Sequence, residues 1–429
     1  MTEPLVLDVE RLAFGFDALA HHEGQVVFLP YAAPGDRVTA SVVAHHRGYL
    51  QAEIDTVLRP GPARVLPGCS FFPTCGGCQW QHVAPPAQRE AKAAIVAEQL
   101  ARLAGVHDVE VLPTIASPND WGYRGRVTLV VEGRRAGYHR ARSHALVEIT
   151  GCPIADPAVS AHLEAAREWL TRLRVPLRRV TILTAPGGVV LAGLAARRPG
   201  AADRTASEAL LARLATVRGT VLAGGGERLV AGDPTIRLPL EPGLDLEVPA
   251  DVFTQVNPAA NPALVAAVLA LGGFARGERV LDLFCGAGNF TLPLARREVA
   301  VEGVERDRVA IASARANAVR LGFHHARFRC ATVAEALAAR APGSLDALIL
   351  DPPRAGAADA VGDIARLRPR RVIYVACDPA TLARDVRAFA THGYRILRVQ
   401  PLDLFPQTFH VETAAELHLT CTERTPIVR

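Results

Sequence analysis

The chain has 429 residues, of which 49% are hydrophobic and 21% charged, a balance typical of a globular protein with two or three domains. No stretch reaches the roughly 18 consecutive apolar residues of a membrane helix, so we expect no membrane span. The first residues, MTEPLVLDVERL, lack a basic region followed by an apolar run, so we expect a cytoplasmic protein without a signal peptide. The formal net charge of +5 is compatible with a polyanionic partner without requiring one.

Residues 1–58 are predicted to form a small β-barrel. Turn-forming residues such as Pro34-Gly35-Asp36 alternate there with short apolar runs, and strands so short and closely spaced are typical of a barrel. The apolar runs are Val26–Leu29, Val38–Val43 and Leu50–Ile54. A linker is then indicated by Pro60, Pro62 and Pro67.

The chain has eight cysteines, and in a reducing cytoplasm they suggest metal binding or catalysis rather than disulfides. Three of them, Cys69, Cys75 and Cys78, form a C-x5-C-x2-C run, and Cys152 follows much later in the chain. Four thiolates suit both zinc and an iron–sulfur cluster. By chemistry alone zinc is preferred, because it is the commoner structural metal.

Residues 59–250 are predicted to form an α+β domain. One helix is expected near 88–103, where apolar residues recur at helical spacing and Gly105 follows the end, and another near 157–173. The strand-like runs are Val127–Val131, Val180–Leu183 and Gly188–Leu194.

Basic and aromatic side chains gather between residues 123 and 144, and this combination is typical of RNA-binding surfaces. Basic groups bind phosphate, and aromatic rings stack on unpaired bases. The alternative is a solvated charged face, which is the better interpretation for any single arginine. The residues are Tyr123, Arg124, Arg126, Arg134, Arg135, Tyr138, His139, Arg140, Arg142 and His144.

In the third predicted domain, residues 251–429, apolar strands alternate with helices from residue 279 onward. This alternation predicts an α/β fold with a doubly wound parallel sheet. The predicted strands are Val280–Phe284, Val299–Val304, Arg327–Cys330, Ala347–Leu350 and Val372–Ala376, followed by Tyr394–Pro401 and Ala415–Cys421. Helices are expected near 290–297, 308–321, 333–340, 357–367 and 379–391.

The first of these strands leads into a glycine-rich turn, Leu281–Phe290, which would let a ligand approach the backbone. A dinucleotide fingerprint needs a third glycine where this chain has Thr291. NAD is therefore less suitable than S-adenosylmethionine, which has no pyrophosphate. The second strand ends next to Glu305, where a carboxylate can accept hydrogen bonds from ribose hydroxyls.

Reactive groups follow the fourth and fifth strands. The fourth is followed by Asp351-Pro352-Pro353-Arg354, a stiff turn at the edge of the sheet where ligands bind. Cys377 follows the fifth strand, and Asp378 and Pro379 predict the start of a helix, whose dipole is expected to favour the thiolate. The alternative is a small, buried and inert cysteine.

A segment that could transfer protons lies near the C-terminus, at Phe405–Glu412. A turn proline is followed there by His410 and Glu412, and either side chain can move a proton. The alternative is a solvated loop, and the sequence alone does not place this segment beside Cys377.

Several motifs together resemble the RNA 5-methyluridine methyltransferase family. They are LDLFCGAGNFTLP at Leu281–Pro293, DPPR at Asp351–Arg354, YVACDPATLARD at Tyr374–Asp385, FPQTFHVE at Phe405–Glu412 and DVFTQVN at Asp251–Asn257. The resemblance implies that Cys377 is the nucleophile and that Glu412 removes the proton from carbon 5 of uracil. It also implies contacts with S-adenosylmethionine from Gln255, Phe284, Asn289, Glu305 and Asp351.

The resemblance extends over nearly the whole chain. The N-terminal barrel resembles the TRAM domain, a small RNA-binding barrel. The cysteine spacing resembles the ribosomal RNA branch of the family, which implies a [4Fe–4S] cluster held by Cys69, Cys75, Cys78 and Cys152, and 23S ribosomal RNA as the substrate. We therefore expect a monomeric class I methyltransferase with a Rossmann-like sheet. One departure is Asp378, where the family often has asparagine, because an acid beside a thiolate could raise its pKa.

The sequence bears on three alternative functions. Cytosine-5 methyltransferases place a cysteine in the turn after the fourth strand, whereas Asp351–Arg354 contains none. A non-catalytic RNA-binding or ribosome assembly factor would be expected to have lost Cys377 or Glu412, and both are present. A transfer RNA substrate stays open.

The family's acid near the adenine has no counterpart in Cys330–Val333, so no adenine contact is predicted there.

Overall fold

The computed structural model describes residues 4–420, which group into two compact units. The first unit consists of residues 4–95, 116–232 and 405–410, and the second of residues 96–115, 233–404 and 411–420. The end of the last predicted strand, Cys421, lies outside the described residues. No helix in the described part of the chain is long and apolar enough to span a membrane.

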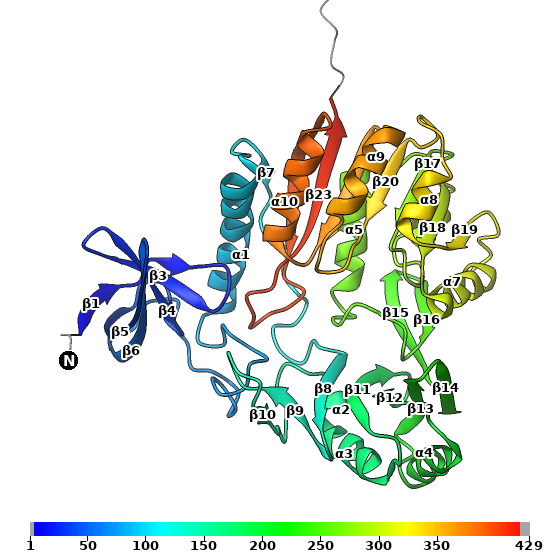
Figure 1. The fold of residues 1–429 in the computed structure, drawn as a ribbon, viewed down its shortest axis with the longest axis horizontal. Helices are drawn as coiled ribbons and strands as arrows, with labels where there is room; N and C mark the ends of the chain where they lie inside the picture. The colour runs from blue at the N-terminus through cyan, green and yellow to red at the C-terminus, as the bar shows by residue number, and fades with distance from the viewer. Residues whose placement is uncertain (1–3, 421–429) are drawn as a thin grey trace, which may run out of the picture. The chain divides into compact units, whose positions relative to one another are not determined.

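The first unit begins with a six-stranded sheet, drawn in blue in Figure 1, with strand order β1-β5-β6-β4-β3-β2. Alternate residues such as Leu7, Val27, Leu29 and Val38 fill its core. The predicted strands are confirmed and lengthened. Their bounds are β1 Leu5–Asp8, β2 Arg11–Leu12, β3 Asp17–His22, β4 Gln25–Pro30, β5 Arg37–His46 and β6 Tyr49–Arg59.

A buried carboxylate fixes the turn that joins β4 to β5. Asp36 is 0% exposed, and it accepts hydrogen bonds from the backbone amides of Ala33 (2.7 Å) and Gly61 (2.8 Å). The Arg64 guanidinium also donates to it from Nη2 at 2.6 Å. These bonds compensate the cost of burying the charge, and the pKa of Asp36 is lowered by them although burial alone would raise it.

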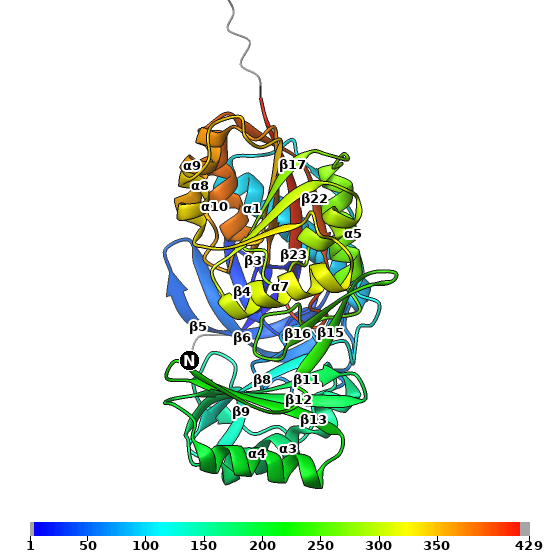
Figure 2. The same ribbon diagram turned by 90° about the vertical axis from the view of Figure 1, so that its right-hand side faces the viewer.

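The remainder of the first unit is a seven-stranded sheet with strand order β10-β9-β8-β11-β12-β13-β14. Figure 2 shows α3 and α4 covering one face of this sheet. Trp169 and Leu210 are among the side chains buried in its core. The strands are β8 Arg126–Glu132, β9 Arg135–His139, β10 Leu146–Val147, β11 Leu177–Ala185, β12 Gly188–Ala195, β13 Val217–Gly224 and β14 Glu227–Gly232. The helices are α2 Pro157–Ala161, α3 Leu163–Arg172 and α4 Ala201–Arg213.

The predicted helix near 88–103 is confirmed as α1, Pro85–Gln99, followed by a π-helical turn η1, Leu100–Ala104. Gly105 ends it with a φ of +68°, a conformation that glycine adopts without strain. After the first sheets, the hairpin of β15 (Thr235–Glu241) and β16 (Leu244–Pro249) begins the main part of the second unit.

The second unit is built on an eight-stranded sheet with strand order β19-β18-β17-β20-β21-β23-β22-β7. The predicted parallel arrangement is confirmed from β19 to β21. The sheet is mixed at its other side, because β23 runs antiparallel between β21 and β22. The strands are β7 Glu110–Val111, β17 Arg279–Leu283, β18 Ala300–Glu305, β19 Arg327–Cys330, β20 Ala347–Leu350, β21 Arg371–Ala376, β22 Tyr394–Leu402 and β23 Glu412–Leu419.

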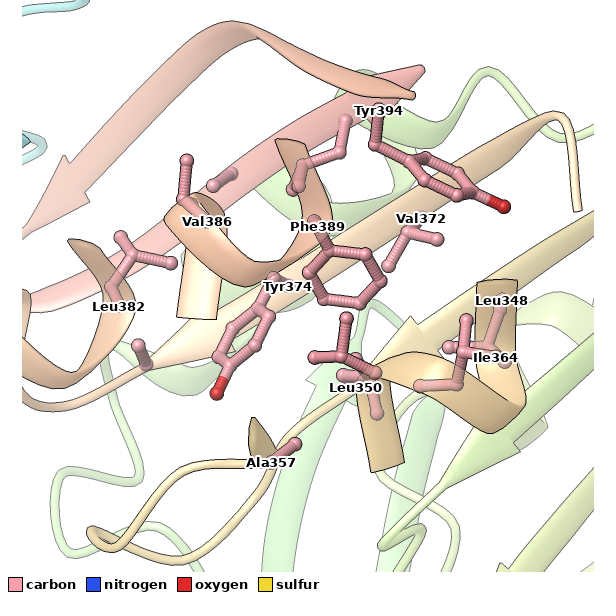
Figure 3. Packing of buried hydrophobic residues seen from close by; sticks show 14 of the residues in the cluster. Leu348, Leu350, Ala357, Ile364, Val372, Tyr374, Leu382, Val386, Phe389 and Tyr394 are labelled. Atoms are coloured by element: carbon pink, nitrogen blue, oxygen red, sulfur yellow. The ribbon is translucent and has the colours of Figure 1, made fainter. Parts of the chain in front are cut away.

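Helices cover both faces of this sheet, with α8, α9 and α10 on one face and α5 on the other (Figure 2). Figure 3 shows the core on the first face, where Phe389 packs against Tyr394 with ring centroids 5.5 Å apart. The predicted helices are confirmed within a few residues. They are α6 Thr291–Arg296, α7 Arg308–Arg320, α8 Val333–Ala338, η2 Ala358–Ala360, α9 Val361–Leu367 and α10 Pro379–Ala390, with α5 Asn261–Gly272 in addition.

Candidate active site

The residues predicted from the strand ends gather at one edge of the second unit's sheet. Strands β18, β17, β20 and β21 are parallel neighbours, so their carboxyl ends share that edge. Glu305 is the last residue of β18, while Phe284, Asp351 and Cys377 directly follow β17, β20 and β21. Four of the predicted site residues are therefore brought together by topology alone.

Glu412 lies beside Cys377 because of the antiparallel pairing of β21 with β23. In this ladder Ala376 pairs with Thr413, and one further step in the same register sets Cys377 against Glu412. Glu412 is therefore the first residue of a buried central strand, with 3% exposure, whereas the sequence was compatible with a solvated loop. Sequence alone had not placed this acid near the cysteine.

The turn after Cys377 has the predicted cap. Asp378 accepts a hydrogen bond from the Thr381 amide (2.9 Å), and Pro379 is the first residue of α10. Arg354 lies 3.6 Å from the Asp378 carboxylate, measured from its Nε. The DPPR turn is thereby joined to the helix that follows Cys377.

The expected preference of Cys377 for the thiolate form is wrong. Burial raises the pKa of its thiol to about 12, and the negative charges of Glu412 and Asp351 add to this effect. The Arg354 guanidinium opposes this effect, and Asp378 adds to it. The position at a helix N-terminus thus does not outweigh burial and nearby acids.

Carboxylates that repel one another line the same edge. Burial raises the pKa of Asp351 to about 7, with a contribution from Asp282, and the pKa of Glu412 rises well above its usual value through burial and the nearby Asp351. Burial likewise raises the pKa of Asp282 to about 7. Among the described residues, no ion pair with a basic side chain includes any of these three acids. A cationic group bound here would be attracted to all of them.

The glycine-rich turn positions further polar groups. Phe284 has a φ of +63°, which is uncommon for a residue with a side chain and often marks a functional site. Asn289 accepts a hydrogen bond from Asn261 (2.9 Å), while its own buried Nδ2 has no partner among the described residues. Glu305 accepts a bond from the Asp307 amide (2.9 Å). Gln255 is buried in the segment between β16 and α5.

Two acids of this region were missed from the sequence. Thr291, which replaces the third glycine, donates to Asp282 at 2.5 Å and so fixes the start of α6. Asp385 in α10 is 0% exposed and accepts bonds from the Tyr374 hydroxyl (2.6 Å) and the Ala357 amide (2.7 Å). For Asp282 the available signal was an acid within an apolar run, which must have a partner when buried, whereas Asp385 follows Arg384 and gave no such signal.

The four predicted metal cysteines are neighbours within the first unit. Burial raises the pKa of Cys75 to about 11 and that of Cys78 to about 12, and in both cases the other thiols, Cys69 and Cys152, contribute. In the described part of the chain, no three His, Cys, Asp or Glu side chains are arranged as ligands of a metal ion.

The backbone holds the two cysteine segments in place. The Gly76 amide donates to the His139 carbonyl (2.9 Å), and a Cβ at Gly76 would approach that oxygen to 3.0 Å. The Gly122 and Arg124 amides donate to the carbonyls of Pro153 and Ile154, directly after Cys152. The charge of Arg124 thereby lies close to the thiols.

The predicted RNA-binding cluster is smaller than expected. Tyr123 is 3% exposed and donates its hydroxyl proton to the Pro406 carbonyl, and Arg124 lies beside the thiols. Arg135 pairs with Glu148 (2.5 Å) and Arg142 pairs with Asp17. Side chains alternate between the faces of a strand, so clustering along the sequence does not fix exposure. Within residues 4–420, the exposed basic side chains of this cluster that have no such ion pair are Arg134, Arg140 and His144.

Two domain families match the chain. Residues 5–54 match the TRAM domain, and residues 275–405 match a methyltransferase domain. The chain is 36% identical to the 23S rRNA (uracil(1939)-C(5))-methyltransferase RlmD of Alkalilimnicola ehrlichii, over 96% of each chain. It is also 36% identical to the RlmD protein of Thiobacillus denitrificans, over 96% of this chain and 98% of that one.

A solved structure has the same fold. It is the tRNA (uracil-54, C5)-methyltransferase of Pyrococcus abyssi in complex with S-adenosyl-L-homocysteine. The TM-score is 0.72 at 25% identity, and the match covers 97% of this chain and all of the other. The class I methyltransferase fold expected from the sequence is thereby confirmed.

Proposed function

The chain belongs to the family of RlmD-type 23S rRNA uracil-C5 methyltransferases, and we propose that its substrate is the uridine of 23S ribosomal RNA that corresponds to uracil 1939 of its relatives. The reaction transfers a methyl group from S-adenosylmethionine to carbon 5 of uracil in RNA. Full-length relatives named for ribosomal RNA are 36% identical, against 25% for the transfer RNA enzyme, which favours ribosomal RNA.

The observation that carries the mechanism is the register of β21 and β23, which sets Cys377 opposite Glu412 one step beyond the pair of Ala376 and Thr413. We propose that the Cys377 sulfur adds to carbon 6 of uracil, which makes carbon 5 nucleophilic enough to take the methyl group. Glu412 then accepts the proton of carbon 5, the double bond between carbons 5 and 6 re-forms, and the sulfur leaves. The Cys377 thiol must give up its proton to solvent before the sulfur adds, because its pKa is raised to about 12.

S-adenosylmethionine supplies an electrophilic methyl group on a positively charged sulfur. The acids at the sheet edge suit this charge, and its approach would also lower the pKa of the Cys377 thiol. We propose that Glu305 accepts bonds from the ribose and that the unpartnered amide of Asn289 donates to the cofactor. Phe284, Gln255 and Asp351 complete the proposed contacts.

The proposed division of labour follows the three predicted domains. Residues 1–58 contribute RNA binding, residues 59–250 carry the cysteine site, and residues 251–429 carry catalysis. The exposed Arg134, Arg140 and His144 are the proposed phosphate contacts of the middle domain. We further propose that the enzyme acts as a monomer in the cytoplasm.

Methyl transfer to defined RNAs tests the function. Labelled S-adenosylmethionine should label a 23S rRNA transcript, and the product should contain one 5-methyluridine at the position corresponding to 1939. Transcripts of 16S rRNA and transfer RNA serve as controls. Labelling of transfer RNA alone would establish the alternative substrate, and no labelling of any RNA would support a non-catalytic assembly factor.

We propose that Cys69, Cys75, Cys78 and Cys152 hold a [4Fe–4S] cluster. The support is the donor set, because four thiols near enough to shift one another's pKa values match the number of cluster ligands, although the described side chains are not arranged around a metal. Arg124 offers a positive charge to offset that of the thiolates. When bound, the cluster would cross-link residues 69–78 to residue 152.

Anaerobically purified protein is accordingly expected to be brown and to contain about four irons per chain. Cys152→Ser should reduce the iron content, because one of four ligands is lost, whereas Cys330→Ser, at an exposed cysteine in the other unit, should leave it unchanged. Colourless protein with one zinc per chain would establish the zinc site that chemistry alone prefers.

A further inference from the structure

The segment Phe405–His410, here called the base loop, ends two residues before Glu412. The base loop belongs to the first unit, whereas Glu412 belongs to the second. The preceding Leu404 belongs to the second unit, where Asn257 donates to its carbonyl (3.2 Å). The chain then joins the first unit for six residues and returns at Val411. Only His410 and Val411 separate Phe409 from Glu412, so the attachment of the base loop constrains the start of β23.

Gln407 is the most tightly held residue of the base loop. Its carbonyl accepts bonds from the Gln79 amide (3.1 Å) and the Trp80 amide (3.0 Å). Its own amide donates to Gln88 Oε1 (2.8 Å), and Gln88 Nε2 lies 3.1 Å from Gln407 Oε1. Gln407 has a φ of +69°, a conformation that a side-chain-bearing residue keeps only when its surroundings hold it.

Gln88 is the centre of this attachment. It is 0% exposed in α1, and its Nε2 also lies within bonding distance of the carbonyls of Trp80 (3.1 Å) and Val83 (2.8 Å). Both the oxygen and the nitrogen of the Gln88 side-chain amide therefore bind Gln407. The same nitrogen also binds backbone carbonyls in the segment after Cys78. A hydrophobic residue of similar size would fill the space but make none of these bonds.

Other contacts support the same loop at its two ends. The Lys92 ammonium donates to the Phe405 carbonyl (3.1 Å), and the Tyr123 hydroxyl donates to the Pro406 carbonyl (2.9 Å). Phe409 packs against Phe14 and Phe16, with ring centroids 5.7 Å and 5.8 Å away.

We propose that Gln88 is a positioning residue for the proton-removal step, acting through the base loop on Glu412. This rests on the proposed role of Glu412 as the base. Proton removal from carbon 5 requires the carboxylate within hydrogen-bond reach, and a displacement of about 1 Å can slow such a step about a hundredfold. Cys377 lies between β21 and α10, outside the base loop, so sulfur addition and methyl transfer should continue.

Loss of the Gln88 bonds should therefore change which intermediate accumulates. In Gln88→Met, turnover is expected to fall about ten- to a hundredfold, and a methylated enzyme–RNA adduct should build up above the wild-type amount. Cofactor affinity should stay within about twofold. A role in folding alone would lower all activities together and would not enrich the adduct.

The matched control is Gln99→Met, the same substitution at the buried last residue of α1, which belongs to the second unit and has no bond to the base loop among the described residues. Single-turnover reactions with labelled cofactor, run on denaturing gels, measure adduct and released product together. If Gln88→Met folds poorly, Tyr123→Phe removes one hydroxyl from the same loop and should show a smaller effect in the same direction.

The outcomes separate this inference from the proposed function. If Glu412→Gln accumulates adduct while Gln88→Met and Tyr123→Phe turn over normally, or slow without adduct, the positioning role of Gln88 is wrong. If Glu412→Gln itself gives no adduct, the assignment of the base fails first. Adduct enrichment in Glu412→Gln and Gln88→Met, but not in Gln99→Met, supports both.

Discussion

Cys377→Ala and Glu412→Gln are both expected to abolish turnover, yet to give opposite results when covalent enzyme–RNA complexes are trapped. Without the sulfur nothing adds to carbon 6, so Cys377→Ala should form no adduct and no methylated RNA. Glu412→Gln keeps the sulfur but lacks the base. In this variant the Cys377 sulfur should add to carbon 6 and carbon 5 should take the methyl group. The reaction should then stop, because the sulfur cannot leave while the C5 proton remains.

Denaturing electrophoresis with methyl-labelled cofactor checks this directly. The Glu412→Gln band should carry label and shift by the mass of the RNA. Cys330→Ala, which removes the exposed cysteine at the end of β19, should behave as wild type. An adduct formed by Cys377→Ala would show that Cys377 is not the nucleophile. Normal turnover by Glu412→Gln would show that another group removes the proton, with His410 the first candidate.

Asp385→Ala is expected to destabilise the catalytic unit by about 3–5 kcal/mol and to remove most activity. The change leaves the buried Tyr374 hydroxyl and Ala357 amide without their acceptor, and Arg384 without its partner (2.8 Å from its Nε). Removing one member of a buried charged network typically has a cost of this size. Because Tyr374 is in β21, Ala357 follows the DPPR turn and Asp385 is in α10, the loss reaches both segments around Cys377.

Hydrogen exchange of β21 and α10, followed by mass spectrometry, measures the local loss without assuming two-state unfolding. Asp363→Ala is the control, since this half-exposed acid in α9 lies 4.0 Å from Arg366 and such pairs contribute about 0–1 kcal/mol. Tyr374→Phe should cost about 1 kcal/mol. Equal protection of Asp385→Ala and Asp363→Ala would show that the buried carboxylate is dispensable.

The strands and helices after residue 279 could be predicted because each buried strand is a short apolar run. Each such run ends beside a polar residue at the edge of the sheet where ligands bind. Val280–Phe284 and Ala347–Leu350 differ from the observed β17 and β20 by at most a residue at each end. Parallel strands share one edge, so Glu305, Asp351 and Cys377 could be expected together without knowledge of side-chain packing.

What the sequence could not provide was long-range register and exposure. The strand β23 starts with an acid and a threonine, so its apolar pattern becomes visible only at Ala414, and the buried Glu412 resembles a loop residue. Tyr123 likewise resembles a surface aromatic until its hydroxyl is seen to bind Pro406, 283 residues further along. Both depend on segments that no local pattern connects.

The burial of Lys92 has a practical consequence for labelling. It is the chain's single lysine, it lies in α1 with 0% exposure, and its ammonium donates to the Phe405 carbonyl. An amine-reactive dye therefore reaches a side-chain amine only when this part of the protein opens. The rate at which the dye labels Lys92 would report how often its contact with the base loop opens. A reagent usually chosen for random surface labelling thereby becomes a probe of local unfolding at one side chain.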